Sequence, residues 1–223
     1  MKTNSELQND VQKAIKWEPL LNAAEIGVTV KDGIVTLTGN VDRFSKKSQA
    51  EYAAQNVAGV RAVVEKIKIN YSNWGTVNDE DIAKEIVSAL KWNFEVPNDR
   101  VKVQVEDGWV TLDGELPWNF QREAAKDAVT NLTGVKGVSN NIKIKSEADD
   151  AIEQKDIECA LERNWSINDD DIDVAVEGSK VTLTGTVNSW YQKEEAGRIA
   201  WNAPGVEMVA NELDVEYVNA LMN

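Results

Sequence analysis

The 223-residue sequence contains no histidine, one cysteine and only four prolines. Without histidine, a site lacks the commonest general base and the usual zinc ligand. The single Cys159 excludes an intramolecular disulfide, and we interpret it as a small buried thiol in a helix. No P-loop, dinucleotide-binding fingerprint, nucleophile elbow or paired-cysteine zinc spacing is present. We therefore expect no enzyme activity, no catalytic residues and no cofactor.

Long hydrophobic runs are also missing. No stretch approaches the roughly 18 apolar residues of a membrane-spanning helix. The first ten residues lack the apolar region of a secretory signal peptide. We therefore predict a cytoplasmic protein without a transmembrane segment, or a periplasmic one if a leader was removed.

Basic residues are scarce in the last third of the chain. Residues 147–223 carry five Lys and Arg against 18 Asp and Glu. Residues 1–71 carry ten against eight, and residues 72–146 carry nine against twelve. The formal charge of -14 therefore lies almost wholly in the last third, where it repels nucleic acid and anionic lipid. We expect no nucleic-acid partner.

Three segments of the sequence repeat one another. Residues 31–39 return as residues 106–114 and, with a changed turn, as residues 178–185. Each segment ends in a glycine that is followed twenty residues later by a Gly-Val pair. We expect backbone roles for all six glycines, the first of each pair in a turn with positive φ and the second as a helix stop. These structural residues are Gly39, Gly59, Gly114, Gly134, Gly185 and Gly205.

The middle repeat shows the expected elements most clearly. Residues 82–90 place apolar side chains at helical spacing after an acidic capping run at residues 78–81. Residues 101–105 alternate strictly, Asp107-Gly108 is a two-residue hairpin signal, and residues 110–112 alternate again. A second helix over residues 124–132 is expected to stop at Gly134, before a short strand at residues 142–144.

This order predicts an α+β protein of three tandem αββαβ domains. Each should hold a three-stranded mixed sheet with two helices on one face, and the right-handed crossover rule places strand three parallel to strand two. The expected domains are residues 1–72, 73–146 and 147–223.

The Asp-Gly-x-Val-Thr-Leu-x-Gly element, with its Gly-Val pair and closing strand, resembles the bacterial BON domain family, named for osmotically inducible protein Y and nodulation proteins. The resemblance covers almost the whole chain three times. In the third copy Gly178-Ser179-Lys180 replaces the Asp-Gly-x turn, and Trp165 stands two residues nearer its glycine than Trp17 and Trp92, which predicts a shortened first loop. The resemblance implies a non-catalytic domain linked to osmotic or envelope stress. It also implies attachment to phospholipid or other ligands and, among relatives, potassium sensing.

The sheet face opposite the helices is expected to be basic in the first two repeats and acidic in the third. Either these faces are simply solvated, or the acidic repeat docks on a basic sheet of the same chain or of a symmetry partner. The expected open-face residues are Thr29, Lys31, Ile34, Thr36, Lys66 and Lys68, then Lys102, Gln104, Trp109, Thr111, Lys143 and Lys145, then Asp173, Ala175, Lys180, Thr182, Glu212 and Asp214.

Eight tryptophans are many for this length. Trp17, Trp92 and Trp165 recur near the end of the first helix, and we interpret them as packing elements that seal each core. Trp74 lies in an expected linker. The other large aromatics stand where sister repeats differ, which favours an interface with protein over insertion into a lipid headgroup layer. The expected partner-binding residues are Trp109, Trp118, Phe120, Trp190, Tyr191 and Trp201.

The acidic run at residues 168–173 places Asp169, Asp171 and Asp173 at alternate positions, as at the start of a calcium loop. The sixth position is Val174 rather than glycine, and no Glu stands at the twelfth. We therefore expect a solvated loop and no metal site, with these aspartates as weak candidates for cation binding.

The sequence as a whole favours a non-catalytic triple-BON interaction protein with a protein partner or self-association. One alternative is a peripheral phospholipid-binding protein that acts through Lys66, Lys68, Lys143 and Lys145. The other is a module that senses potassium or calcium.

Overall fold

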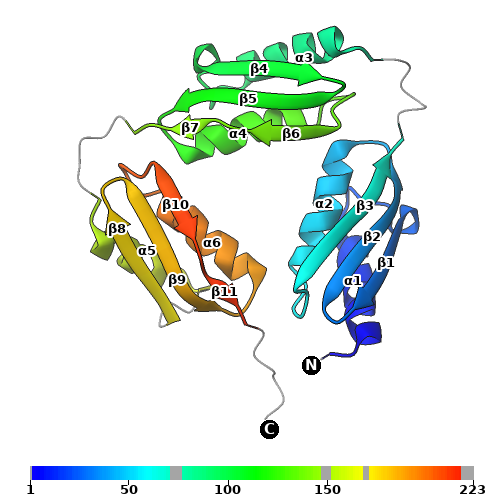
Figure 1. Ribbon diagram of the computed structural model, residues 1–223, viewed down its shortest axis with the longest axis horizontal. Helices are drawn as coiled ribbons and strands as arrows, with labels where there is room; N and C mark the ends of the chain where they lie inside the picture. Colours follow the sequence, from blue (N-terminus) through cyan, green and yellow to red (C-terminus); the bar gives the residue numbers. More distant parts are fainter. Residues whose placement is uncertain (1, 71–76, 147–151, 168–170, 217–223) are drawn as a thin grey trace. The chain divides into compact units, whose positions relative to one another are not determined.

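The computed structural model describes residues 2–70, 77–146, 152–167 and 171–216 (Figure 1). Within these ranges the order helix, two strands, helix and closing strand occurs three times. The expected α+β class and αββαβ order are confirmed.

The first repeat contains α1 (Asn4–Trp17), the 3-10 turn η1 (Ala23–Glu25), β1 (Ile26–Lys31), β2 (Ile34–Val41), α2 (Phe44–Gln55) and β3 (Ala62–Ile69). The second contains α3 (Asp79–Trp92), η2 (Asn98–Arg100), β4 (Val101–Glu106), β5 (Trp109–Leu116), α4 (Asn119–Thr130), β6 (Gly137–Asn140) and β7 (Lys143–Ile144). The third contains α5 (Gln154–Glu162), β8 (Ile172–Glu177), β9 (Lys180–Val187), α6 (Trp190–Trp201), β10 (Met208–Asn211) and β11 (Asp214–Val215).

The second strand of each repeat is the centre of its sheet. β1 pairs antiparallel with β2, and β3 pairs parallel with it. In the third repeat β8 is antiparallel to β9, while β10 and β11 are parallel to it. β7 is likewise parallel to β5. The closing strand is thus parallel to the central strand, as expected.

One face of each sheet is buried beneath the helices. In the first repeat, Val35 and Leu37 of β2 pack in one cluster with Val11 of α1 and Ala50 of α2. The third repeat has a cluster of its own, built from α5, α6 and the inner face of β9. Each fully buried Val, Leu or Ile contributes about 1.5 to 3 kcal/mol, so each of these two clusters stabilises the repeat that contains it.

The two-residue hairpin turns agree with the sequence. Asp32 and Asp107 have φ of 53° and 50°, and the glycine after each is also positive, as a type I′ turn requires. In the third repeat Gly178 has φ of 61°, and Glu177 pairs with Lys180 across a two-residue connection. The altered third motif therefore forms a hairpin as well.

Two predicted boundaries are corrected. Helix α4 ends at Thr130, so Gly134 lies in the loop beyond the helix rather than at its cap. The closing strand begins at Gly137, before the predicted segment, and breaks between β6 and β7. The break follows Asn140, whose side-chain oxygen accepts a bond from the Ile142 N–H at 3.3 Å, while its amide donates to the Arg122 carbonyl at 2.8 Å. Local side-chain bonding of this kind competes with the ladder.

The first glycine of each pair serves a different purpose from the one predicted. Gly39 lies inside β2, not in a turn, although its φ of 136° is positive as expected. A Cβ atom there would lie 2.0 Å from the carbonyl oxygen of Glu25, and Gly185 would meet the Asp171 carbonyl at the same distance. These glycines therefore allow the start of the first strand to approach the central strand.

The third repeat is not shortened. Glu18, Asn93 and Asn164 each donate a backbone bond to the residue three positions earlier, and each lies 21 residues before the first glycine of its repeat. Arg163 therefore stands at the position of Trp17 and Trp92, whereas Trp165 matches Phe94 of the second repeat. The prediction of a shortened loop was wrong because it matched Trp165 with Trp17 and Trp92.

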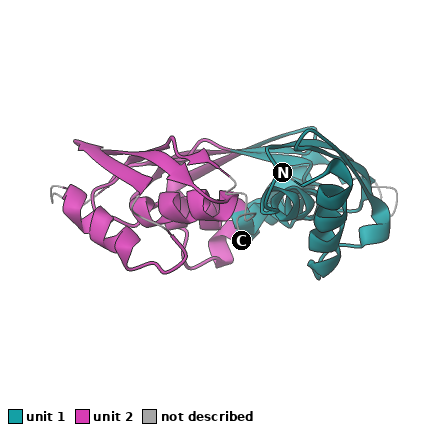
Figure 2. Ribbon diagram, turned by 90° about the horizontal axis from the view of Figure 1, so that it is seen from below, with its two compact units in different colours: residues 1–89, 104–111, 127–139 teal, residues 90–103, 112–126, 140–223 magenta. Residues whose placement is uncertain are grey.

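Figure 2 divides the chain into two compact units, residues 1–89, 104–111 and 127–139, and residues 90–103, 112–126 and 140–223. The second repeat contributes to both units. Among the described residues, no helix has the length and apolar character needed to cross a bilayer.

Candidate binding surfaces

The open sheet faces carry the side chains that the alternation predicts. Lys66 and Lys68 of β3 are exposed, as are Lys143 and Lys145 in the second repeat. Glu212 and Asp214 of the third repeat, which match Lys66 and Lys68 of the first, are exposed, so the reversal of charge between these two repeats is present on the surface. Lys145 forms a long 3.8 Å ion pair with Glu115. Docking between basic and acidic faces stays a prediction.

Trp109 dominates the open face of the second repeat. Its ring covers Gly137, where a Cβ atom would lie 2.2 Å from the ring. The side chain is still 56% exposed, so one face of the indole is available. Beside it lies a shallow hollow of about 290 Å³ lined by Gln104, Glu106, Asp107, Trp109 and Thr111. Because Gly137 has no side chain, the Trp109 ring can lie against the sheet at this position.

The turn before the second helix exposes further aromatics. Trp118 immediately precedes α4, and Phe120 lies in its first turn; both are exposed. In the third repeat Tyr191 is exposed, whereas Trp190 is half-buried with the Lys193 ammonium 5.5 Å from its ring centre. The structure thus brings these residues to matching places on their repeats.

Trp201 differs from the other predicted partner-binding residues. It is the last residue of α6, is half-buried and packs against the core of the third repeat. The comparison with Gln55 and Thr130 suggested an exposed position, but the larger ring folds back onto its own domain. A role in partner binding stays a prediction for this residue.

The tryptophans near the end of the first helix do not seal the cores, which corrects that interpretation. Trp17 and Trp92 are each 84% exposed, Phe94 is 96% exposed and Trp165 is 95% exposed. Apolar side chains two to four residues farther on, such as Val96 and Ile167, are buried instead. Sequence reasoning missed this surface because recurrence within a chain suits packing and binding equally well.

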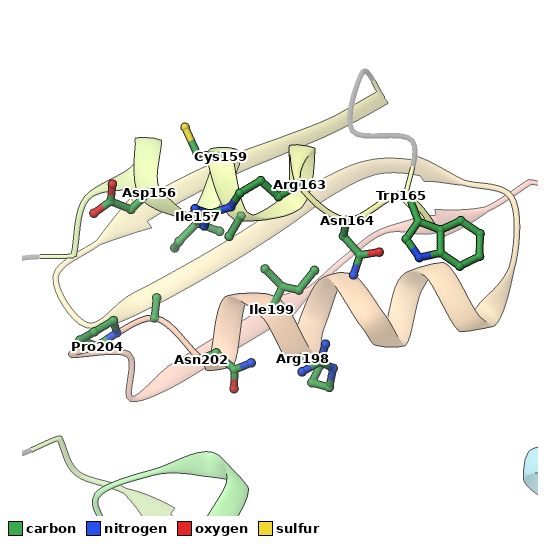
Figure 3. Close-up of a pocket in the computed structure, with 12 residues that line it drawn as sticks. Asp156, Ile157, Cys159, Arg163, Asn164, Trp165, Arg198, Ile199, Asn202 and Pro204 are labelled. Atoms are coloured by element: carbon green, nitrogen blue, oxygen red, sulfur yellow. The ribbon is translucent and has the colours of Figure 1, made fainter.

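A groove of about 740 Å³ lies between α5 and α6 of the third repeat (Figure 3). Its floor includes the buried Ile157 and Ile199, and Figure 3 shows Trp165 and Pro204 at opposite ends. No sequence motif indicated this groove, because it depends on two helices that are far apart in the chain. The lining residues are Asp156, Ile157, Cys159, Ala160, Arg163, Asn164, Trp165, Arg198, Ile199, Asn202, Ala203 and Pro204.

Glu195 fixes the α6 side of this groove. Its carboxylate accepts two bonds from the Arg198 guanidinium, at 2.7 and 2.6 Å, and one from the Asn164 amide at 2.8 Å. The bonds from Arg198 first, and then the Asn164 bond, outweigh partial burial and hold the pKa of Glu195 below its ordinary value. Glu195 therefore stays ionised near neutral pH and joins α6 to the loop after α5.

Cys159 is half-buried and unpaired in the groove wall, rather than fully buried as the sequence suggested. Asp169 lies outside the described residues, while Asp171 and Asp173 are exposed. In the part of the chain that the structure describes, no cluster of His, Cys, Asp and Glu has the arrangement of a metal site.

The chain is similar to osmotically-inducible protein Y of Escherichia coli strain K12, with 29% identity over 146 residues, which cover 64% of this chain and 73% of that protein. Among solved structures, it aligns with the C-terminal domain of CdsD, a structural protein of the type III secretion system of Chlamydia trachomatis, over 96% of this chain and all of that one. That match has 17% identity and a TM-score of 0.26.

The BON domain model matches residues 3–71, 78–146 and 149–217. The starts of the three matched ranges are separated by the same numbers of residues as Glu18, Asn93 and Asn164, the residues that donate the backbone bonds after the first helices. The three repeats therefore align without gaps. With three matched αββαβ units that together span most of its length, this chain belongs to the BON domain family.

Proposed function

We propose that this chain is a non-catalytic interaction protein of the osmotic stress response, and that it binds a second copy of itself or another protein through exposed aromatic side chains. The observation that carries the proposal is the exposure of Trp109, Trp118 and Phe120 on the second repeat. Sister repeats hold smaller or polar residues at two of these positions, so the fold does not require large aromatics there. Aromatic residues exposed in this way are enriched at protein interfaces. The similarity to osmotically-inducible protein Y supports the link to osmotic stress.

The sister repeats supply the variants that test this proposal. Trp118→Ser copies Ser189, and Phe120→Ser copies Ser45, so both changes are compatible with the fold. Loss of one buried aromatic anchor at an interface costs about 2 kcal/mol or more, so we expect the double variant to weaken association at least tenfold. Sedimentation velocity over a range of protein concentrations measures the self-association constant.

The matched control is Tyr52→Ser, which removes an exposed aromatic from α2 of the first repeat. It should leave association unchanged. If the wild-type chain is monomeric at every concentration, self-association is contradicted. If the control loses as much affinity as the double variant, the surface at Trp118 and Phe120 is not the interface.

A second candidate is binding to anionic phospholipid through the open sheet faces, favoured by the exposure of Lys66, Lys68, Lys143 and Lys145. Each lysine near an anionic surface contributes about 1 kcal/mol. Changing all four to glutamine should therefore abolish co-sedimentation with vesicles of mixed phosphatidylglycerol and phosphatidylcholine, and salt should weaken wild-type binding. Binding that persists in the variant, or that is equal on pure phosphatidylcholine, contradicts this mechanism.

A further inference from the structure

The groove between α5 and α6 has a different composition from the matching surfaces of the other repeats. In the gapless register, Arg163 and Arg198 correspond to Trp17 and Tyr52 in the first repeat and to Trp92 and Asp127 in the second. Only the third repeat therefore places two guanidinium groups along its helix pair. Residues 147–223 contain just five basic residues, so two of these five line a single groove in the most acidic part of the chain.

The two arginines differ in whether a carboxylate pairs with them. Arg198 is held by Glu195 through two short bonds, so its charge is already compensated. Arg163 is exposed, and within the described residues no carboxylate pairs with it. Among the described residues that line the groove, Asp156 is the only carboxylate, and it forms no ion pair with Arg163. The groove therefore presents one uncompensated guanidinium beside an apolar floor.

The floor and the volume of the groove indicate the size and the apolar character of the ligand. Ile157 and Ile199 are less than a tenth exposed and lie below the opening, flanked by Ala160 and Ala203. A volume of about 740 Å³ falls in the range of sites that take small molecules, and the lining combines the apolar floor with polar side chains in similar measure. Trp165 stands fully open at one end and offers an aromatic face to the ligand (Figure 3).

We propose that this groove binds a small amphiphilic organic anion, with its apolar body on Ile157 and Ile199 and its carboxylate at Arg163. A guanidinium and a carboxylate form a strong charge-assisted pair, which gives the site its preference for anions. The site is separate from the exposed aromatics of the second repeat, so it stands or falls independently of the proposed interaction function.

The test uses the full chain with decanoate as the anionic probe and decyltrimethylammonium as a cationic probe of equal chain length. Isothermal titration calorimetry should show saturable binding of one decanoate, and markedly weaker binding of the cation. Arg163→Gln should raise the decanoate dissociation constant about tenfold or more, since it removes the charge-assisted contact. Asp156→Asn should lower the constant, because it removes the only like charge in the lining.

Lys155→Gln is the matched control. Lys155 lies on the same helix and carries the same charge, but it does not line the groove. The control should bind decanoate as the wild type does, and circular dichroism of all three variants should show that they fold.

The only cysteine of the chain locates the bound probe. Cys159 lines the groove, so saturating decanoate should slow its alkylation by N-ethylmaleimide, and Arg163→Gln should reverse that protection. The proposal is overturned if calorimetry shows no saturable binding, if both probes bind equally, or if Arg163→Gln and Lys155→Gln have the same effect. Binding without protection of Cys159 would place the anion elsewhere and also overturn it.

Discussion

At the scale of single residues, the repeats show which side chains the fold demands and which are free to differ. Gly39, Gly114 and Gly185 share a positive φ and a close approach to a carbonyl oxygen, so every copy of the fold needs them. The contact between the first loop and the second helix is freer. Gln49 donates to Glu18 at 2.9 Å in the first repeat, whereas Asn164 donates to Glu195 in the third, with donor and acceptor exchanged.

The clash at Gly185 leads to a prediction about stability. Gly185→Ala should destabilise the third repeat by about 3 kcal/mol, because its Cβ would meet the Asp171 carbonyl and its φ of 115° disfavours any side chain. Amide hydrogen exchange in peptides from β8 and β9 measures the loss. The control is Gly178→Asn, in an open turn with nothing within 4 Å of a Cβ, which should cost less than about 1 kcal/mol. Equal effects would show that strain at Gly185 is relieved by movement of the first strand.

At the scale of elements, the first helix of the second repeat is tied to the hairpin by one carboxylate. Asp79, at the start of α3, accepts bonds from the Asp107 and Gly108 N–H groups at 2.7 and 2.8 Å. The first repeat makes a weaker version, in which Asn4 accepts one bond from the Asp32 N–H at 3.0 Å. Such a contact orients a helix on its sheet and compensates the helix dipole at the same time.

We expect Asp79→Ala to destabilise the second repeat by about 2 kcal/mol, since it leaves two turn N–H groups without their anionic partner. Hydrogen exchange of the β4 and β5 peptides provides the measurement. Glu80→Ala removes a neighbouring carboxylate that forms only an exposed ion pair with Lys84, and it should cost less than about 0.5 kcal/mol. A loss as large in Glu80→Ala would mean that the general charge of the helix start, rather than the tie to the hairpin, accounts for the effect.

At the scale of the whole molecule, charge distinguishes three copies of one fold. Residues 147–223 have a formal charge of -13, whereas residues 1–71 have a formal charge of +2. Excess charge of one sign destabilises a compact state by self-repulsion, and salt screens that repulsion. The first and third repeats therefore have similar cores but should respond differently to ionic strength.

Raising the salt concentration from low to moderate should stabilise the third repeat on the order of 1 kcal/mol, as the sum of many weak exposed interactions, and leave the first nearly unchanged. Hydrogen exchange followed in both repeats of the same sample provides an internal control. A uniform response would show that the acidic residues are already compensated within the third repeat.

The sequence by itself determined the fold. Strict alternation, the Asp-Gly turns and helical spacing act locally, so they predicted the αββαβ order and the open sheet faces from short windows. The parallel third strand followed from the general crossover rule once that order was known. Only the tertiary structure decided the position of the tryptophans near the end of the first helix, the purpose of Gly39 and the groove at Arg163. Each depends on atoms that are distant in the chain. The tryptophan rings are exposed because no cavity of the fold accepts them, Gly39 lies against a distant carbonyl oxygen, and the groove forms between two helices that pack on the same sheet. A sequence pattern shows which residues recur, but the burial of a side chain depends on the residues that pack against it in the folded chain.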